Sequence, residues 1–504
     1  MTMKHSILVL FFTIVSFQIF GQSDKQDFYS KSITSEELKE KLYTYASDEF
    51  EGRETGTKGL KIAIKYLKDH YVNLEVDAAK GDGAYLQNVP LKLVKTPEVY
   101  MSIKDQSFGY YTDFISLAGG ESIQIDTKKI ILVGHGISDD NYNDYEGLDV
   151  NGKIVVAIGG EPKDNDGSYL VSGSAKISKW SNNRQEISSK LNAAREQGAK
   201  GFFLINDAMF QIYAPYYKSR DERDGESDLS LDVNEENVMY SFLVGNTMKE
   251  ALLEGSQIKI DYNEKIEPIT SNNVAALIKG SEKPDEYIIL SAHLDHIGIH
   301  DGEVFNGADD DGSGTVAILE IAEAFKAALK DGNGPKRSIL FLHVTGEEKG
   351  LLGSEYYTDY EPIVPLTQTL ANLNIDMIGR TDPKRLEGKR NYIYLIGSDK
   401  LSTDLHNISE EMNLKYTNIE LDYTYNDEND PNRYYYRSDH YNFAKNNIPV
   451  IFYFNGTHDD YHQASDTPDK IQYDLLENRT RLVFHTAWEL ANREEAVRVD
   501  RGLE

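Results

Sequence analysis

Short apolar runs alternate with amphipathic segments throughout the second half of the chain. Runs such as Tyr287–Leu290 and Ile339–Val344 are too short for helices and suit strands that are buried on both faces. Residues 313–325 follow the first of these runs and carry apolar side chains at helical spacing, and residues 470–492 do the same at the end of the chain. This alternation predicts an α/β domain over residues 266–504, with a mostly parallel central sheet flanked by helices.

The first half of the chain has a different pattern. Residues 32–71 suggest two helical pieces separated by the polar, glycine-broken loop Ser47–Gly59, so residues 22–84 are expected to form an N-terminal helical segment that packs on the α/β domain. From residue 85 to residue 265, short β-like runs are separated by turn residues, which predicts a separate β-rich inserted module. Its isolated His135 is typical of a structural histidine.

Residues 1–21 have the layout of a secretory signal peptide. Lys4 precedes an apolar core over residues 7–20, and the small Gly21 offers a cleavage point. An uncleaved N-terminal anchor is the alternative. Since no other stretch is apolar enough to span a bilayer, we expect a secreted or periplasmic protein with no stable membrane insertion after signal removal.

Charge and cysteine content narrow the functional classes. Among 504 residues, 83 acidic side chains outnumber 53 basic ones, for a formal net charge of -30. This balance argues against nucleic acid as a partner, because phosphate binding requires basic patches. The chain has no cysteine, so a metal would have to be held by histidine, aspartate and glutamate.

Ligand-type residues follow strand after strand in the α/β half. In a parallel sheet the carboxyl ends of the strands lie side by side, so residues far apart in sequence can converge there. Each residue alone is a weak signal, since an aspartate at a helix start is usually a cap and adjacent loop glutamates are usually solvated. Together they suit a zinc site, with an acid/base site as the alternative. The candidates are His293, Asp310, Glu347, Glu348, Asp376 and His462.

These residues lie in blocks that resemble the co-catalytic dizinc aminopeptidase family of bacterial leucyl aminopeptidases and aminopeptidase Y. The blocks occur in the family's order between residues 272 and 495, and residues 47–53 are similar to its N-terminal segment. The insert, with residues 143–160 and 193–207, resembles a protease-associated domain. The blocks are His293-Leu294-Asp295, Gly307–Gly314, Glu347–Ser354, Asn374–Gly379, Tyr461-His462 and Asp466-Thr467.

The resemblance implies a role for each position. Asp310 would bridge two zinc ions, with His293 and Asp376 completing one ion and Glu348 and His462 the other. Glu347 would be the general base that takes a proton from the zinc-held water. Asp295 would orient His293, and Tyr461 would either hydrogen-bond the developing oxyanion or serve as a packing aromatic. Asp309 and Asp311 are expected to be loop or helix-start residues. Ser438-Asp439-His440 matches a recurrent block of the family, and its role stays open.

The expected function is therefore a secreted zinc-dependent aminopeptidase that acts on peptides with free N-termini. A carboxypeptidase or dipeptidase on the same scaffold is an alternative, and it would need a basic residue near the site, for which Arg380, Arg433 and Arg437 are candidates. Two further alternatives are a glutaminyl cyclase-like acyltransferase with a single zinc and a binding module that has lost its metals.

Overall fold

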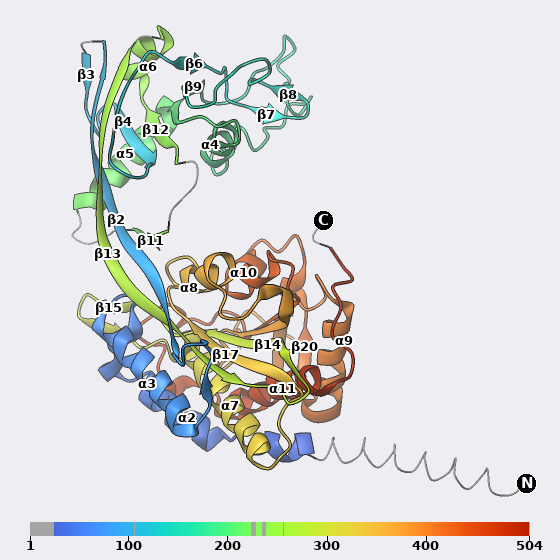
Figure 1. The fold of residues 1–504 in the computed structure, drawn as a ribbon. Coiled ribbons are helices and arrows are strands. Elements are labelled where there is room, and N and C mark those ends of the chain that lie inside the picture. Colours follow the sequence, from blue (N-terminus) through green and yellow to red (C-terminus); the bar gives the residue numbers. More distant parts are fainter. Residues whose placement is uncertain (1–24, 105, 223–227, 234–237, 256, 503–504) are drawn as a thin grey trace, which may run out of the picture. The chain divides into compact units, whose positions relative to one another are not determined.

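The computed structural model describes residues 25–502, apart from 105, 223–227, 234–237 and 256. The predicted signal peptide lies outside the described residues. The chain forms two compact units (Figure 1). Met1–Leu91 and Ile269–Glu504 make up the first, here named the α/β unit, and Lys92–Pro268 make up the second, named the insert unit. Within the described residues, no helix combines the length and the apolar character needed to cross a membrane.

The centre of the α/β unit is a block of four parallel strands. They lie in the order β17 (Arg337–Val344), β14 (Lys283–His293), β18 (Thr369–Ile375) and β21 (Val450–Phe454). Antiparallel neighbours flank the block: the end of β13 (Ile258–Ile278) pairs with β17, and β19 (Tyr392–Ile396) pairs with β21. The prediction of a mostly parallel central sheet is confirmed.

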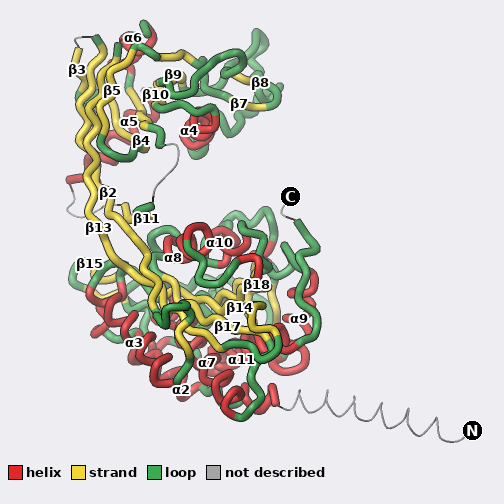
Figure 2. Tube along the Cα trace, in the orientation of Figure 1, coloured by secondary structure: helices red, strands yellow, loops and turns green. Residues whose placement is uncertain are grey.

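Both faces of this sheet are covered, which explains why its strands are continuous apolar runs. Ile288 and Leu290 point into one core, and Ile289 between them points into another. Figure 2 shows helices on both sides of the strands. The first core is completed by α2 (Ser35–Tyr45), α3 (Lys58–Leu74), α7 (Gly314–Lys330), α9 (Thr403–Met412) and α11 (Tyr473–Asn492). The second includes α10 (His440–Ala444).

Several elements differ from the sequence-based expectation. The segment after Glu347 and Glu348 forms only the short helix α8 (Leu352–Glu355), which continues into a π-type turn, Tyr356–Tyr360. Gly350 and Leu351 before it have φ values of 109° and 63°, which a helix cannot accommodate. The remaining small strands of this unit are β1 (Asp77–Ala78), β15 (Gly298–His300), β16 (Glu303–Phe305) and β20 (Glu420–Asp422).

The insert unit is built on a five-stranded sheet in the order β4-β12-β10-β9-β6. Two strands belong partly to this unit and partly to the α/β unit, and they are longer than the short runs that the sequence suggested: β2 (Leu86–Ile103) has 18 residues and β13 has 21. The other elements of this region are β3 (Gln106–Phe108), β4 (Phe114–Ala118), β5 (Ile123–Thr127), β6 (Ile130–Leu132), β7 (Ser138–Asp139), β8 (Tyr142–Asn143), β9 (Ile154–Ile158), α4 (Glu186–Glu196), β10 (Gly201–Ile205), α5 (Asp207–Glu222), β11 (Asp228–Leu231), β12 (Tyr240–Val244) and α6 (Asn246–Leu253).

Candidate metal centre

The carboxyl ends of the parallel strands carry most of the candidate ligands. His293 is the last residue of β14, Asp376 comes directly after β18, and Glu347 and Glu348 follow β17. Because these strands are parallel neighbours, their ends share one edge of the sheet. Two more candidates reach the same edge from loops: Asp310 lies in the turn Ala308–Ser313 before α7, and His462 lies in the segment after β21.

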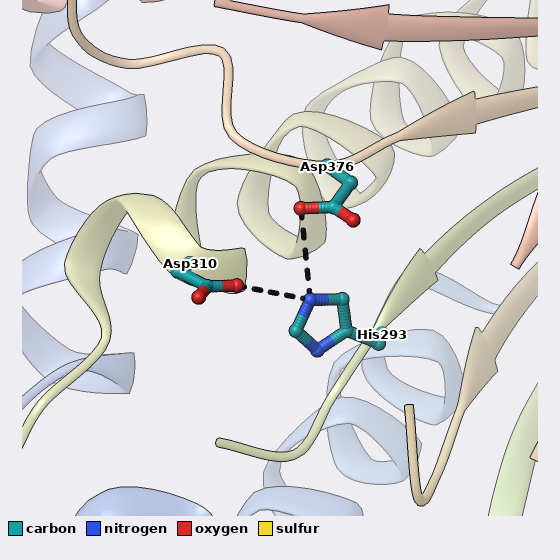
Figure 3. Close-up of side chains that lie close together, drawn as sticks. All are labelled: His293, Asp310 and Asp376. Carbon is teal, nitrogen blue, oxygen red and sulfur yellow. Dashed lines mark ion pairs between the residues drawn. The ribbon is translucent and has the colours of Figure 1, made fainter. Parts of the chain in front are cut away.

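One cluster forms around His293. Its Nε2 atom lies 3.2 Å from Oδ1 of Asp310 and 3.7 Å from Oδ1 of Asp376. Figure 3 shows the imidazole facing both carboxylates. All three side chains are buried, so this corner of the site is shielded from bulk water.

A second cluster forms on the other side of Asp310. Nε2 of His462 lies 3.0 Å from Oδ2 of Asp310 and 3.1 Å from Oε2 of Glu348. The two oxygens of the Asp310 carboxylate thus face different histidines, Oδ1 toward His293 and Oδ2 toward His462. A carboxylate placed in this way can bridge two cations.

His296 is a member of the second cluster that the sequence reasoning did not assign. It is fully buried, and its Nδ1 atom lies 2.8 Å from Oε1 of Glu348 and 3.8 Å from Oδ2 of Asp310. Among the residues that the structure describes, His296, Asp310 and Glu348 form one of two groups whose ligand atoms are close enough to hold an ion, the other being His293, Asp310 and Asp376. The signal was present in the sequence, since His296 is a second imidazole three residues after His293.

The side-chain nitrogen and oxygen atoms of the two clusters are better placed to bind divalent cations than to hydrogen-bond to one another. Buried polar atoms without a hydrogen-bond partner gather here: Nε2 of His293, Oδ2 of Asp310, Oε1 of Glu348, Nδ1 of His296 and Nε2 of His462. Native proteins rarely leave such atoms unpaired. Two ligands on a tetrahedral zinc with bonds of about 2.0–2.1 Å lie about 3.3 Å apart. The 3.0–3.7 Å separations around His293 and His462 bracket that value.

The electrostatics of the clusters point the same way. Burial lowers the pKa of His462, but Asp310 and Glu348 outweigh it and raise the value to about 10. His293 behaves alike, with its pKa raised well above 6.5 by Glu347, Asp310 and Asp376 against the effect of burial. The carboxylates therefore create a strongly negative potential, which favours any positive charge placed between them, whether a proton or a metal ion.

Glu347 lies beside both clusters, and its carboxyl group makes no hydrogen bond to any residue that the structure describes. Burial raises its pKa well above 4.5, and Glu348 and Asp376 add to the shift, while His293 opposes it. Its backbone N–H donates to Oδ1 of Asp295 at 3.1 Å. This contact holds the Glu347 backbone near the end of β17. The carboxyl group is therefore held in position through the backbone and is itself left without a hydrogen bond to the described residues.

Asp295 is buried and contacts several of the residues around the clusters. Its Oδ2 accepts a hydrogen bond of 2.8 Å from Thr55. Nδ1 of His293 lies 3.0 Å from the main-chain carbonyl of Asp295 and 4.0 Å from its carboxylate. The carbonyl is therefore the nearer partner of the imidazole, and the carboxylate contacts Thr55 and the Glu347 backbone.

The block Ser438-Asp439-His440 packs against the first cluster and hydrogen-bonds to one of its carboxylates. The Ser438 hydroxyl donates to Oδ2 of Asp376 at 2.6 Å and accepts from the Asn374 amide at 2.9 Å. Asp439 accepts from Ser354 at 2.5 Å, and His440 stacks on Phe452. Ser438 thus hydrogen-bonds to Oδ2 of Asp376, whereas Oδ1 is the oxygen that faces His293.

The neighbours of Asp310 in the aspartate triplet shape its turn. Asp309 accepts from the backbone of Gly379 and lies 3.1 Å from His458, and Asp311 accepts from the backbones of Gly314 and Met377. The buried Arg53 donates to the carbonyls of Asn306 and Gly307 just before the triplet. These contacts leave Asp310 as the member of the triplet that faces the histidines.

Tyr461 covers the second cluster. Its ring stacks on that of His462 with centroids 3.9 Å apart, and its hydroxyl accepts a 3.4 Å hydrogen bond from Arg437. Of the three candidate arginines, Arg380 pairs with Asp460 at 3.0 Å, and Arg433 lies over the Tyr436 ring and lines a separate cavity. Only Arg437 lines the cavity that holds the clusters.

Part of the α/β unit is similar in sequence to a known protein family and to known proteins. Residues 273–487 match the profile of a family described as Peptidase family M28. Aminopeptidase NAALADL1 of Mus musculus is 36% identical over 124 residues, which cover 24% of this chain and 16% of the mouse protein. A probable glutamate carboxypeptidase of Arabidopsis thaliana, AMP1, is 37% identical over 105 residues, covering 21% and 14%. The matched segments are thus a small part of these relatives' own length.

Among solved structures, the aminopeptidase from Aneurinibacillus sp. strain AM-1 is similar over 95% of this chain and 98% of its own. The sequence identity is 19% and the TM-score is 0.49.

Proposed function

We propose that the chain is a zinc-dependent aminopeptidase that removes N-terminal residues from peptides, a proposal supported by the match of residues 273–487 to the profile of peptidase family M28. The observation that carries this proposal is the Asp310 carboxylate, whose two oxygens face two separate histidine and carboxylate clusters. The proposal includes a secretory signal peptide at residues 1–21 and the identification of the insert at residues 85–265 as a protease-associated domain.

In this proposal the chain holds two zinc ions. His293 and Asp376 would bind one, Glu348 and His462 the other, and Asp310 both. Bound zinc supplies a water of lowered pKa and polarises the peptide carbonyl.

The remaining side chains would handle protons and charge. Glu347, which makes no hydrogen bond through its carboxyl group and has a raised pKa, would accept the proton of the attacking water and deliver it to the leaving amine. Tyr461 would donate a hydrogen bond from its hydroxyl to the oxyanion that develops on the scissile carbonyl.

The test is an activity panel on the purified full chain, with and without a strong chelator. We expect hydrolysis of aminoacyl amides and of peptides with free N-termini, loss of activity with the chelator, recovery with added zinc, and two zinc ions per chain by elemental analysis. Hydrolysis of N-terminally blocked peptides instead would support the carboxypeptidase alternative. A stoichiometry of one zinc with cyclisation of N-terminal glutamine would support the glutaminyl cyclase alternative. Protein that binds no zinc would refute the proposal.

A further inference from the structure

Arg437 stands where the metal-centre cavity meets a second, outer cavity. The inner cavity is lined by the carboxylates of both clusters together with Met377, Phe452 and Phe454. The outer one has a volume of about 540 Å³ and includes Lys384 and Asp459. Both share the side chains of Tyr434, Arg437, Thr457 and Tyr461. A peptide bound with its scissile bond at the clusters would therefore extend past Arg437.

The guanidinium of Arg437 is exposed and has no carboxylate within ion-pair distance among the residues that the structure describes. Its contacts are the Tyr461 hydroxyl at 3.4 Å and the Tyr434 ring, 5.0 Å from its carbon to the centroid. The ammonium group of Lys384, which lines the same outer cavity, donates to the Thr457 hydroxyl at 3.0 Å and likewise has no carboxylate partner in the described part of the chain. The charged groups of Arg437 and Lys384 thus line the outer cavity without a carboxylate partner in the described part of the chain, and both are free to bind an anion.

The metal ligands do not supply that anion. The inner cavity has four acidic side chains, Asp310, Glu347, Glu348 and Asp376. Two divalent cations would balance their combined charge. The positive charges of Arg437 and Lys384 then face only the exposed Asp459 across the outer cavity, so the opening carries a net positive charge.

We propose that Arg437, assisted by Lys384, binds a carboxylate of the peptide substrate, so that the preferred substrates are anionic. The inference rests on the proposed aminopeptidase function and names its substrate class. A planar guanidinium suits a carboxylate because it can donate two parallel hydrogen bonds. The carboxylate comes from the side chain of an acidic substrate residue or from the C-terminus of a short peptide. Arg437 repels the α-ammonium group of the substrate, so the carboxylate and the ammonium group bind in different places.

The experiment compares matched substrate pairs that differ by one carboxylate. Glu-p-nitroanilide against Gln-p-nitroanilide reports on a side-chain carboxylate, and Leu-Gly against Leu-Gly-amide reports on a terminal one. Each pair is assayed on the zinc-loaded full chain as wild type, as Arg437→Gln and as Arg433→Gln. Arg433 is the matched control, because it lies only four residues away but stacks on Tyr436 and lines a different cavity.

We expect the wild type to prefer the anionic member of one pair, which identifies the source of the carboxylate. Arg437→Gln should lower the anionic-to-neutral ratio of kcat/KM in that pair by about ten- to a hundredfold, mainly through KM. Arg433→Gln should leave the ratio unchanged. An unchanged ratio in Arg437→Gln, or no wild-type preference in either pair, would overturn the inference, as would equal losses on both members, which would mean that Arg437 only positions Tyr461. If neither the anionic nor the neutral member of any pair is cleaved, it is the proposed function that fails.

Discussion

Nδ1 of His296 lies 2.8 Å from Oε1 of Glu348, the oxygen that does not face His462. Both side chains are withdrawn from solvent, and neither of these two atoms has a hydrogen-bond partner. The second metal position is therefore bordered by two imidazoles, one on each side of the same glutamate.

The first prediction concerns this pair. His296→Ala should weaken binding of the second zinc by about 10- to 100-fold, because Glu348 loses the group that orients its carboxylate or the ion loses a ligand. Zinc affinities can be measured by competition with a chromophoric chelator. The exposed His300, four residues later, is the control, and His300→Ala should bind both ions as the wild type does. Two unchanged affinities in His296→Ala would show that His296 has no part in the site.

Replacing each of the adjacent glutamates, Glu347 and Glu348, by glutamine should affect zinc binding differently. Glu347→Gln is expected to keep two zinc ions and to lower kcat by about 10²- to 10⁴-fold, since the proton acceptor is lost while the ligands remain. Glu348→Gln should lose zinc as well as activity, because its carboxylate contacts His462 at 3.1 Å and His296 at 2.8 Å. Elemental analysis and steady-state kinetics on both variants check this. Loss of zinc from Glu347→Gln would assign it as a ligand instead of the base.

The hydrogen bond from Ser438 to Asp376 can be tested through its effect on zinc binding at the first cluster. Ser438→Ala removes the 2.6 Å hydrogen bond to Asp376 and should weaken zinc binding at the first position by about tenfold or more. Ser291→Ala is the matched control, because Ser291 belongs to the same buried network but contacts Asn374 and Asn372, and not Asp376. Equal zinc affinities in the two variants would mean that Ser438 does not tune the ligand.

Acid stability should depend on His343, a buried histidine that is not among the candidate zinc ligands. Burial lowers the pKa of His343 from 6.5 to about 3, while its Nε2 lies 2.8 Å from the Tyr71 hydroxyl. Between these pH values the unfolded chain binds a proton that the folded chain does not, so the free energy of unfolding falls as the pH is lowered below 6.5. The loss attributable to His343 amounts to about 2 kcal/mol at pH 5.

His343→Gln should therefore show a shallower decline of stability between pH 7 and pH 5 than the wild type. The measurement is the urea midpoint of each protein at both pH values, with chelator present in all samples. Parallel declines would indicate that His343 is protonated in the folded protein.

Much of the architecture could be predicted from the sequence, because the relevant signals are local. Continuous apolar runs such as Tyr287–Leu290 indicated strands buried on both faces, and the helical spacing over residues 313–325 indicated the helix that became α7. Boundaries were less predictable. The long strands β2 and β13 were read as short runs, since their exposure pattern changes along their length.

By itself the sequence determined the kind of chemistry: without cysteine, and with His293, Asp310, Glu348, Asp376 and His462 following successive strands, the candidate ligands were imidazoles and carboxylates at one sheet edge. Only the tertiary structure decided which neighbours act on them. His296 borders Glu348, Ser438 contacts Asp376, and Arg437 alone among three candidate arginines lines the cavity. The reason is physical: periodicity records which side of an element is buried, whereas these contacts depend on loop paths and on side chains brought together from distant segments.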